Sequence, residues 1–282
     1  MTSKAYLTTR NQVRVPAIMY GTAWKKEATA KLVESAVDAG FRSIDTANQL
    51  IHYDEALVGE ALLALKQKGI GRESLFLQTK FTSVNGQDAR TPYDAKANLT
   101  TQVNQSMVSS LKHLHTDYLD SYVLHGPYSR QGLTPQDLEV WAAMEEHFNE
   151  GRTRMIGVSN VSADQLDALC SVAVTKPMIV QNRCYAMRGW DSAVREICRK
   201  EGIIYQGFSL LTANPHVLES GAVHAMARRL NTGVAQIVFR FAMQIGMLPL
   251  TGTTNQQHML DDLTAESLSL TAEEMQTIEN MG

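Results

Sequence analysis

Short apolar runs alternate with longer amphipathic stretches along the whole chain. Each apolar run ends in a turn or polar residue, and the stretch after it has the periodicity of a helix, which is the pattern of repeated β-α units. We therefore predict eight strands, at residues 18–23, 42–47, 74–80, 118–125, 154–160, 177–183, 203–208 and 247–253. Amphipathic helices are predicted at residues 28–39, 55–67, 99–115, 135–149 and 163–174.

Single residues at the ends of these elements support the same division. Ser162 stands where a helix N-cap is expected, directly before the segment 163–174. Several helical segments end in a glycine before the next strand, and glycine most readily adopts the left-handed conformation of a helix C-cap. These glycines are Gly40, Gly151, Gly202 and Gly246.

The number of units points to one closed architecture. No Pro/Ser-rich linker or block of charge divides the 282 residues, so we expect a single domain spanning residues 1–282. Eight β-α units in a chain of this length fit an α/β fold of the (β/α)8 TIM-barrel type better than an open doubly wound sheet, which usually has fewer strands. Residues 6–15 are predicted as a short N-terminal β-hairpin that closes the bottom of the barrel, and a C-terminal helical segment is expected after the last strand.

Composition and charge argue against several classes of function. The formal net charge is −3, so the chain has no excess of Lys and Arg with which to bind nucleic acid or an anionic membrane. Residues 1–10 hold no apolar stretch long enough for a signal peptide, and no run reaches about 18 apolar residues, so a cytoplasmic location is expected. The three scattered cysteines are predicted to be small buried residues, and no zinc-binding motif of Cys or His suggests a metal site.

Polar residues stand at the predicted strand ends, where a (β/α)8 barrel carries its chemistry. Asp45 and Lys80 end neighbouring strands, and because an unpaired buried charge is costly, we expect them to form an ion pair. Either residue alone could instead be a structural group. A tyrosine beside that lysine, such as Tyr53 in the loop after the second strand, would have a lowered pKa and could donate a proton near pH 7. His125 on the next strand could orient a carbonyl oxygen.

Several short motifs are spread over nearly the whole chain. They are Gly40-Phe41-Arg42-Ser43-Ile44-Asp45-Thr46-Ala47 with Glu55-Ala56-Leu57-Val58-Gly59, then Gln78-Thr79-Lys80, Asp117-Tyr118-Leu119-Asp120 before His125, Ile156-Gly157-Val158-Ser159-Asn160 and Thr251-Gly252-Thr253. Together they resemble the motifs of the aldo-keto reductases. The resemblance implies a (β/α)8 barrel that reduces aldehydes or ketones with NADP(H) without a Rossmann glycine fingerprint, and this sequence has no G-x-G-x-x-G after any strand.

The resemblance also implies a catalytic tetrad and a nucleotide site. Tyr53 would be the general acid, Lys80 and Asp45 the pair that lowers its pKa, and His125 the group that orients the substrate oxygen. The residues implied to hold the nicotinamide end are Asp45, Ser159, Asn160, Gln181 and Phe208, of which Phe208 could also be an ordinary core residue. The residues implied to bind the rest of the nucleotide are Gly21, Thr22, Ser209, Leu211, Gly252, Thr253, Thr254, Asn255, His258, Asp261 and Asp262.

The loop before Tyr53 departs from the family pattern. Family members place the tyrosine five residues after the aspartate, where this chain has Leu50, so the loop carries an insertion. Tyr53 is the only tyrosine between Asp45 and Gly59 and is therefore assigned the acid role. His52 stands beside it, and the loop geometry decides which of the two reaches the barrel mouth.

Two further departures concern the coenzyme and the substrate. The family commonly has Lys and Arg, which hold the 2′-phosphate, where this chain has Gly252 and His258, so NADPH is the expected coenzyme with NADH as the alternative. The loop after the fourth strand is reduced to residues 126–134. We expect a shallow, open mouth for a small-molecule carbonyl substrate, lined by Trp24 and Trp190 unless these are packing residues. The resemblance implies a monomer.

Two other functions fit the same residues. A barrel lysine such as Lys80 could form a Schiff base with a carbonyl substrate, as in an aldolase. Alternatively, a barrel that binds a nicotinamide nucleotide but turns over little would act as a redox-sensing or regulatory subunit, and the displaced tyrosine is the reason to consider it. Residue types alone do not separate this second alternative from a reductase.

Overall fold

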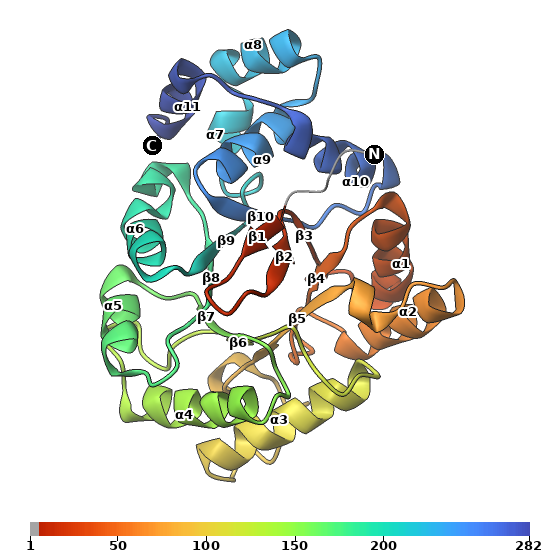
Figure 1. Cartoon of the computed structure of the whole chain (residues 1–282), viewed down its shortest axis with the longest axis vertical. Helices are drawn as coiled ribbons and strands as arrows, with labels where there is room; N and C mark the ends of the chain where they lie inside the picture. Colours follow the sequence, from red (N-terminus) through yellow and green to blue (C-terminus); the bar gives the residue numbers. More distant parts are fainter. Residues whose placement is uncertain (1–5) are drawn as a thin grey trace.

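The protein is a closed barrel of parallel strands surrounded by helices (Figure 1). The computed structural model describes residues 6–282. Residues 1–5 lie outside the described residues, and they include the first half of the segment 1–10 in which no signal peptide is expected. The barrel strands are β3 (Met19–Gly21), β4 (Ser43–Asp45), β5 (Phe76–Phe81), β6 (Ser121–Leu124), β7 (Ile156–Ser159), β8 (Ile179–Arg183), β9 (Ile204–Phe208) and β10 (Met247–Thr251). Each pairs with the next in sequence, and β10 closes the ring against β3. The predicted (β/α)8 fold and all eight predicted strands are confirmed.

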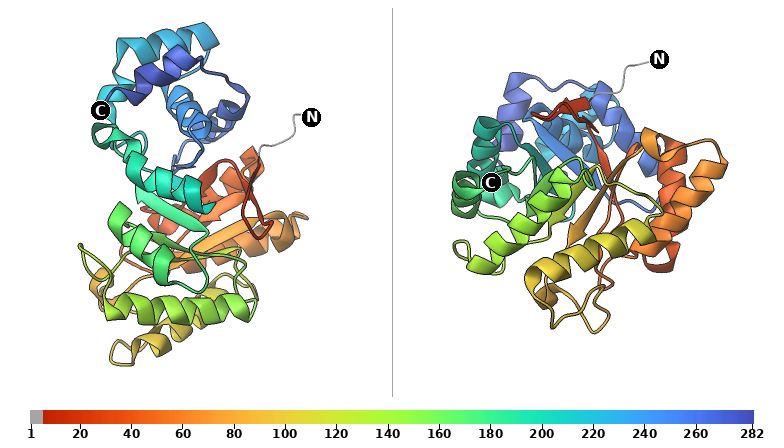
Figure 2. Two further views of the ribbon diagram at one scale, coloured as in Figure 1. Left: turned by 60° about the vertical axis from the view of Figure 1, so that its left-hand side comes forward. Right: turned by 60° about the horizontal axis from the view of Figure 1, so that its bottom comes forward.

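Helices follow the strands around the outside of the barrel. They are α1 (Thr29–Ala39), α2 (Glu55–Gln67), α3 (Leu99–His113), α4 (Pro135–Asn149), α5 (Ala163–Val172), α6 (Ser192–Glu201), α7 (Pro215–Leu218), α8 (Gly221–Leu230), α9 (Val234–Gln244), α10 (Gln256–Thr264) and α11 (Ala272–Glu279). Short 3-10 helices are η1 (Lys26–Ala28), η2 (Arg72–Ser74), η3 (Val84–Gly86), η4 (Ala186–Asp191) and η5 (Ala265–Ser267). The expected C-terminal helical segment is present as α10 and α11, and Figure 2 shows α11 beside α8 at one end of the molecule.

The predicted helix ends are confirmed as well. The Ser162 side chain accepts a hydrogen bond from the Gln165 backbone, and Gln165 returns one to the Ser162 backbone, so α5 begins with a full capping box. The four glycines expected at helix ends all have positive φ angles, between 65° and 125°. The left-handed cap lets each chain segment turn sharply from a helix into the next strand.

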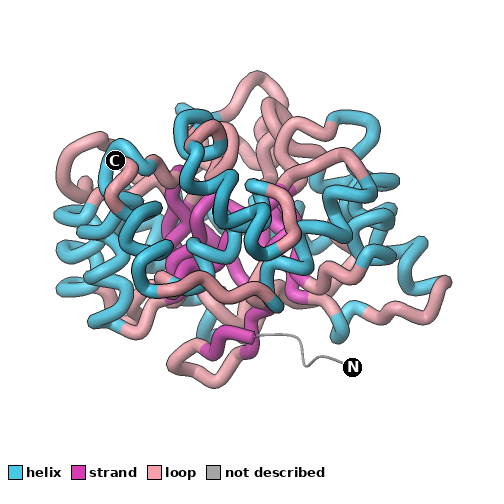
Figure 3. Tube along the Cα trace, turned by 90° about the horizontal axis from the view of Figure 1, so that it is seen from above, coloured by secondary structure: helices cyan, strands magenta, loops and turns pink. Residues whose placement is uncertain are grey.

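The N-terminal hairpin closes the bottom of the barrel, as predicted. Its strands β1 (Tyr6–Thr8) and β2 (Arg14–Pro16) pair antiparallel, and they lie beyond one end of the barrel strands in Figure 3. Val15 packs in an apolar cluster with residues at the beginnings of the barrel strands, among them Met19 and Phe76. Asn11 Nδ2 donates to the Arg154 carbonyl (2.8 Å) just before β7. The hairpin therefore covers the end of the barrel opposite the predicted site.

Three glutamines fill the barrel interior above that apolar layer. Gln78 Nε2 donates to Gln206 Oε1 (2.8 Å), and Gln206 Nε2 donates back to Gln78 Oε1 (3.1 Å). Gln181 Nε2 donates to the same Gln206 oxygen (2.9 Å). Side chains alternate along a strand, so Phe76, Gln78 and Lys80 of β5 share the inward face. The glutamines thus join the apolar floor to the charged groups at the mouth.

The cysteines and the lengths of the helices bear on the expectations from composition. Cys170, Cys184 and Cys198 are free and buried, as predicted. Within residues 6–282, every helix is too short or too polar to cross a bilayer.

His147 is a buried histidine whose ionisation opposes folding. It is only 2% exposed, and within residues 6–282 neither ring nitrogen makes a hydrogen bond. Burial, and then the charge of Arg152, lower the pKa of His147 to about 4, although Glu150 acts in the opposite direction. The unfolded chain takes up this proton near pH 6.5 and the folded chain does not, so stability falls as the pH drops through this interval.

We expect His147→Phe to remove this pH dependence. Between pH 7 and pH 5 the unfolding free energy of the wild type should fall by about 2 kcal/mol more than that of the variant. Urea unfolding of both proteins at the two pH values measures the difference. Equal losses in both proteins would contradict the prediction, because every other titrating group is common to the two.

Candidate active site

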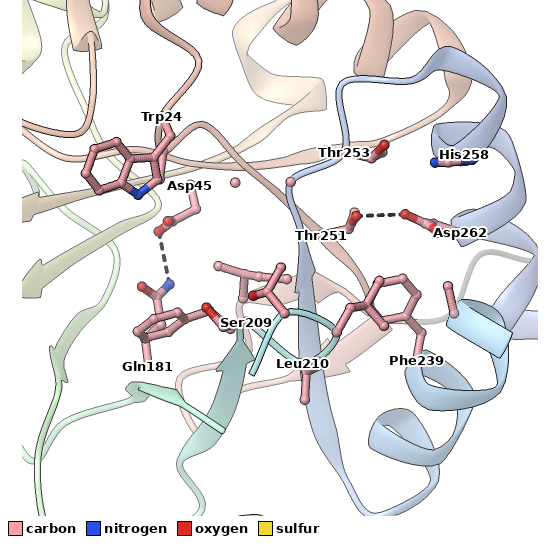
Figure 4. Close-up of a pocket in the computed structure, with 18 of the residues that line it drawn as sticks. Trp24, Asp45, Gln181, Ser209, Leu210, Phe239, Thr251, Thr253, His258 and Asp262 are labelled. Atoms are coloured by element: carbon pink, nitrogen blue, oxygen red, sulfur yellow. Dashed lines mark hydrogen bonds between the residues drawn. The ribbon is translucent and has the colours of Figure 1, made fainter. Parts of the chain in front are cut away.

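A large cavity opens at the carboxyl ends of the barrel strands. It has a volume of about 680 Å³ and is lined by residues from the ends of β3, β4, β7, β8, β9 and β10, from the loops that follow, and from helices α9 and α10. Figure 4 shows Asp45 and Gln181 together in one part of it, with Thr253, His258 and Asp262 in another. A cavity of this size is within the range of cofactor and ligand sites, and this face is where such barrels carry their chemistry.

Asp45 and Lys80 form the expected ion pair. Lys80 is 0% exposed, and its Nζ lies 2.7 Å from each carboxylate oxygen of Asp45 and 2.8 Å from the Thr46 carbonyl. Burial lowers the pKa of Lys80, and Asp45 opposes that effect. All three ammonium hydrogens are used, and the nitrogen has no path to a substrate. The Schiff-base alternative is therefore disfavoured.

Tyr53 reaches the cavity in spite of the inserted loop residues. Lys80 Nζ lies 5.0 Å from the centre of the Tyr53 ring, and the rings of Tyr53 and His125 are 5.9 Å apart with an edge-on orientation. Both tyrosine and histidine line the cavity. Within residues 6–282 no hydrogen bond occupies the Tyr53 hydroxyl. The loop thus brings this tyrosine and His125 together at the mouth.

The pKa of Tyr53 differs from the expectation. We expected the ammonium of Lys80 to lower it, but burial raises the pKa of Tyr53 above its ordinary value and the negative charge of Asp45 acts in the same direction. Burial is the main cause, and the Asp45 carboxylate, 2.7 Å from Lys80 Nζ, offsets part of the positive charge that Lys80 presents to the phenol. Tyr53 is therefore a protonated, neutral phenol at physiological pH.

His125 is held as a neutral imidazole. Burial lowers the pKa of His125 to about 3, with the charges of Lys80 and His52 acting in the same direction. Its Nδ1 lies 2.6 Å from the Thr82 hydroxyl, which fixes the ring. When the Thr82 hydroxyl donates to Nδ1, the other ring nitrogen carries the proton and is the hydrogen-bond donor of the ring.

The inserted turn before Tyr53 is anchored to α3 and to the loop between β5 and α3. Asn48 Nδ2 donates to the Ser106 carbonyl (3.2 Å) and the Ser110 hydroxyl (3.1 Å) of α3. Gln49 Nε2 donates to the Gly86 carbonyl (2.7 Å), and the Tyr53 backbone N–H donates to the Gln49 carbonyl (3.1 Å). These contacts determine where the tyrosine lies, which the sequence spacing alone left open.

We expect Asn48→Ala to lower kcat about tenfold, because a small displacement of Tyr53, the residue implied to be the general acid, would be costly, and to cost about 1–2 kcal/mol of stability. The affinity for coenzyme should not change, because Asn48 lies outside the cavity wall. Steady-state kinetics and coenzyme titration test this. Asn11→Ala, which removes an amide hydrogen bond at the opposite end of the barrel, is the matched control and should leave kcat unchanged. Unchanged kcat in Asn48→Ala would contradict the positioning role.

The two tryptophans expected at the mouth have different locations. Trp24 lines the cavity, is 66% exposed, and packs against His52 with ring centres 4.1 Å apart and ring planes tilted by 54°. Trp190 is 0% exposed, and its indole N–H donates to the Ile278 carbonyl (3.2 Å), so of the two alternatives left open for it the structure shows the packing residue. His52 packs beside Trp24 and is not part of the cavity wall, whereas Tyr53 is.

Most residues implied to bind nucleotide line the cavity. Those at the nicotinamide end are Asp45, Ser159, Asn160, Gln181 and Phe208. Those along the rest are Gly21, Ser209, Leu211, Gly252, Thr253, His258, Asp261 and Asp262. Thr22, Thr254 and Asn255 are not part of the wall: Thr22 is buried and bonds the Asp45 carbonyl through its backbone and hydroxyl (3.0 and 2.9 Å), and Asn255 caps α10.

The structure adds wall residues that the sequence did not suggest. Lys25 lines the cavity beside Gly252, and Gln236 and Thr251 lie near Asp262. The Asp262 carboxylate is buried and accepts hydrogen bonds from Thr251 Oγ1 (2.7 Å) and Gln236 Nε2 (3.1 Å), the first of which is drawn in Figure 4. Burial raises the pKa of Asp262.

Comparison with known proteins agrees with this geometry. The model of the aldo/keto reductase family matches residues 17–282. The uncharacterized oxidoreductase YtbE of Bacillus subtilis is 29% identical over 98% of this chain and 92% of its own length. The NADPH-dependent codeinone reductase 1-4 of Papaver somniferum is 30% identical over 96% of this chain and 88% of its own length. A crystal structure of an aldo/keto reductase from Brucella melitensis has the same fold, with a TM-score of 0.83 over 99% of this chain and 100% of that one, at 24% identity.

This chain belongs to the aldo-keto reductase family. It is therefore an NAD(P)H-dependent oxidoreductase. The expected family, fold and enzyme class are confirmed.

Proposed function

We propose that this protein reduces an aldehyde or ketone to the alcohol with NADPH, and that Tyr53 is the general acid. The observation that carries the proposal is the meeting of Tyr53 and His125, with ring centres 5.9 Å apart, on one cavity wall above the buried Asp45–Lys80 pair. The codeinone reductase relative is NADPH-dependent by name, which supports NADPH as the coenzyme of this protein.

The cavity residues suit a nicotinamide nucleotide. Gln181 Oε1 accepts no hydrogen bond within residues 6–282, because its Nε2 alone is used, on Asp45 (3.0 Å) and Gln206 (2.9 Å). A carboxamide N–H could donate to this oxygen, and the Ser159 hydroxyl and Asn160 amide lie on the same wall. Phe208 offers an aromatic surface that is not fully buried. When bound there, NADPH would supply the hydride.

The protein side of the reaction is a proton transfer to the substrate oxygen. The Tyr53 phenol, kept protonated by burial, donates a hydrogen bond to the carbonyl oxygen and gives up its proton as alkoxide character develops. An alkoxide is a stronger base than a phenolate, so a raised phenol pKa does not prevent this transfer. The neutral His125 donates a second hydrogen bond to the same oxygen and so orients it. Lys80 stabilises the phenolate that results.

The substrate side of the cavity is open and partly aromatic. The exposed indole of Trp24, which packs against His52, borders the mouth near Tyr53. We propose a small-molecule carbonyl substrate with an apolar or aromatic group that packs on Trp24. The proposed organisation is a cytoplasmic monomer in which residues 1–282 form one domain.

A direct assay of NADPH oxidation and alcohol formation tests the function. The purified protein should oxidise NADPH in the presence of nitrobenzaldehyde and produce the corresponding alcohol in equal amount. Tight NADPH binding, measured by quenching of protein fluorescence, without turnover over a broad carbonyl panel would overturn the proposal and favour the regulatory alternative.

A further inference from the structure

Position 252 borders the cavity but provides no positive charge that could bind a phosphate. Gly252 has no side chain, and His258 on α10 is exposed and carries a charge only when protonated. A phosphate dianion binds most strongly to fixed positive charges through charge-assisted hydrogen bonds. If the adenosine 2′-phosphate of NADPH binds here, its counter-ion must come from another element.

Lys25 supplies an ammonium group at this point from the loop between β3 and α1. Strands β3 and β10 are neighbours in the barrel, with Tyr20 paired to Thr251, so this loop lies beside Gly252. Lys25 Nζ donates a hydrogen bond to the Gly252 carbonyl. A Cβ atom at position 252 would lie 3.5 Å from that nitrogen. The ammonium thus lies next to the space that a side chain at 252 would enter.

This ammonium has no anionic partner in the protein. Within residues 6–282 Lys25 forms no ion pair, although it lines the cavity and is partly buried. The two carboxylates on the same wall are already hydrogen-bonded: Asp261 accepts from Gln257 Nε2 (2.9 Å), and Asp262 accepts from Thr251 and Gln236. Burial lowers the pKa of Lys25, a cost that a bound anion would offset.

We propose that Lys25 is the counter-ion of the NADPH 2′-phosphate in this protein and replaces the cation that position 252 lacks. The inference rests on the proposed function, because it assumes that the nucleotide binds in this cavity. The Lys25 ammonium, on the loop between β3 and α1, lies at the part of the wall that a side chain at position 252 would reach. Selectivity for NADPH over NADH then depends on Lys25.

Coenzyme binding to Lys25→Met tests the assignment. Fluorescence titration should give a Kd for NADPH raised roughly 10- to 100-fold, the loss expected for a charge-assisted contact, and a Kd for NADH within about twofold of the wild type. Titration with 2′,5′-ADP and with ADP should repeat the contrast without a nicotinamide. Lys26→Met, which removes an exposed lysine outside the cavity wall, is the matched control and should change neither affinity.

Two results would overturn the inference. Equal weakening of NADPH and NADH would mean that Lys25 meets the pyrophosphate, which both coenzymes have. Unchanged affinities would mean that Lys25 meets neither group. If Lys25→Met lost NADPH selectivity while the wild type reduced no carbonyl, the proposed function would fail and the phosphate assignment would stand.

A second variant tests the position rather than the residue. Adding Gly252→Lys to Lys25→Met should restore NADPH affinity to within a few-fold of the wild type, because the new side chain starts 3.5 Å from the place where the Lys25 ammonium lay. A double variant that folds, binds NADH normally and still fails to recover NADPH affinity would contradict the proposal that the two positions serve the same phosphate.

Discussion

Replacing Tyr53 with phenylalanine is expected to lower kcat for aldehyde reduction by about 10²- to 10⁴-fold, the range that a general acid contributes. The hydroxyl is the only group removed, and within residues 6–282 it makes no hydrogen bond, so no buried partner loses its contact. The fold and the NADPH affinity should therefore be retained. Steady-state kinetics with nitrobenzaldehyde, together with NADPH titration and thermal unfolding, measure the three quantities.

The control and the competing assignment use two other residues. Tyr118→Phe removes a phenol before β6, at the opposite end of the barrel, and should leave kcat unchanged. His52→Ala tests the neighbour that could have taken the acid role. Full activity in Tyr53→Phe combined with a large loss in His52→Ala would show that the acid was assigned to the wrong residue of the loop.

The positions of the barrel strands could be predicted from the sequence because each strand is a short apolar run between turn residues. The observed strands are shorter than predicted, as in β6, which begins at Ser121 rather than at Tyr118. The apolar pattern indicates which residues are buried, whereas a strand extends only as far as its backbone hydrogen bonds to the neighbouring strands. The Asp45–Lys80 pair could be predicted for a similar reason, since two buried opposite charges at adjacent strand ends have to meet.

Features that depend on closure of the barrel could not be predicted. Lys25 contacts Gly252 although 227 residues separate them, and Gln78 pairs with Gln206 although 128 residues separate them. In neither pair does the sequence around one residue indicate which residue it will contact. The two alternatives for Trp190 stayed open because a tryptophan between a strand and a helix looks the same in the sequence whether it faces a cavity or the core. The pKa of Tyr53 was misjudged because the charge of Lys80 was considered without the burial of the phenol and without the opposing charge of Asp45.

Breaking the buried ion pair should separate its effects on stability and on catalysis. Lys80→Met leaves the Asp45 carboxylate buried and without a counter-ion, so the unfolding free energy should fall by about 3–5 kcal/mol. The double variant Asp45→Asn, Lys80→Met removes both charges, and the Gln78 and Gln181 amides can still donate to the oxygen at position 45. Most of the lost stability should therefore return in the double variant, as measured by urea unfolding.

Activity should not return with it. In our account Lys80 stabilises the phenolate that forms on Tyr53, and loss of such an electrostatic contact lowers kcat by about 10²- to 10³-fold in both variants. Lys68→Met, which disrupts an exposed ion pair with Glu34, is the control and should change stability by less than about 1 kcal/mol and kcat not at all. A double variant with wild-type kcat would mean that the pair only supports the fold. The double variant decides this point even if Lys80→Met alone fails to fold, because it keeps the barrel interior hydrogen-bonded without a buried charge.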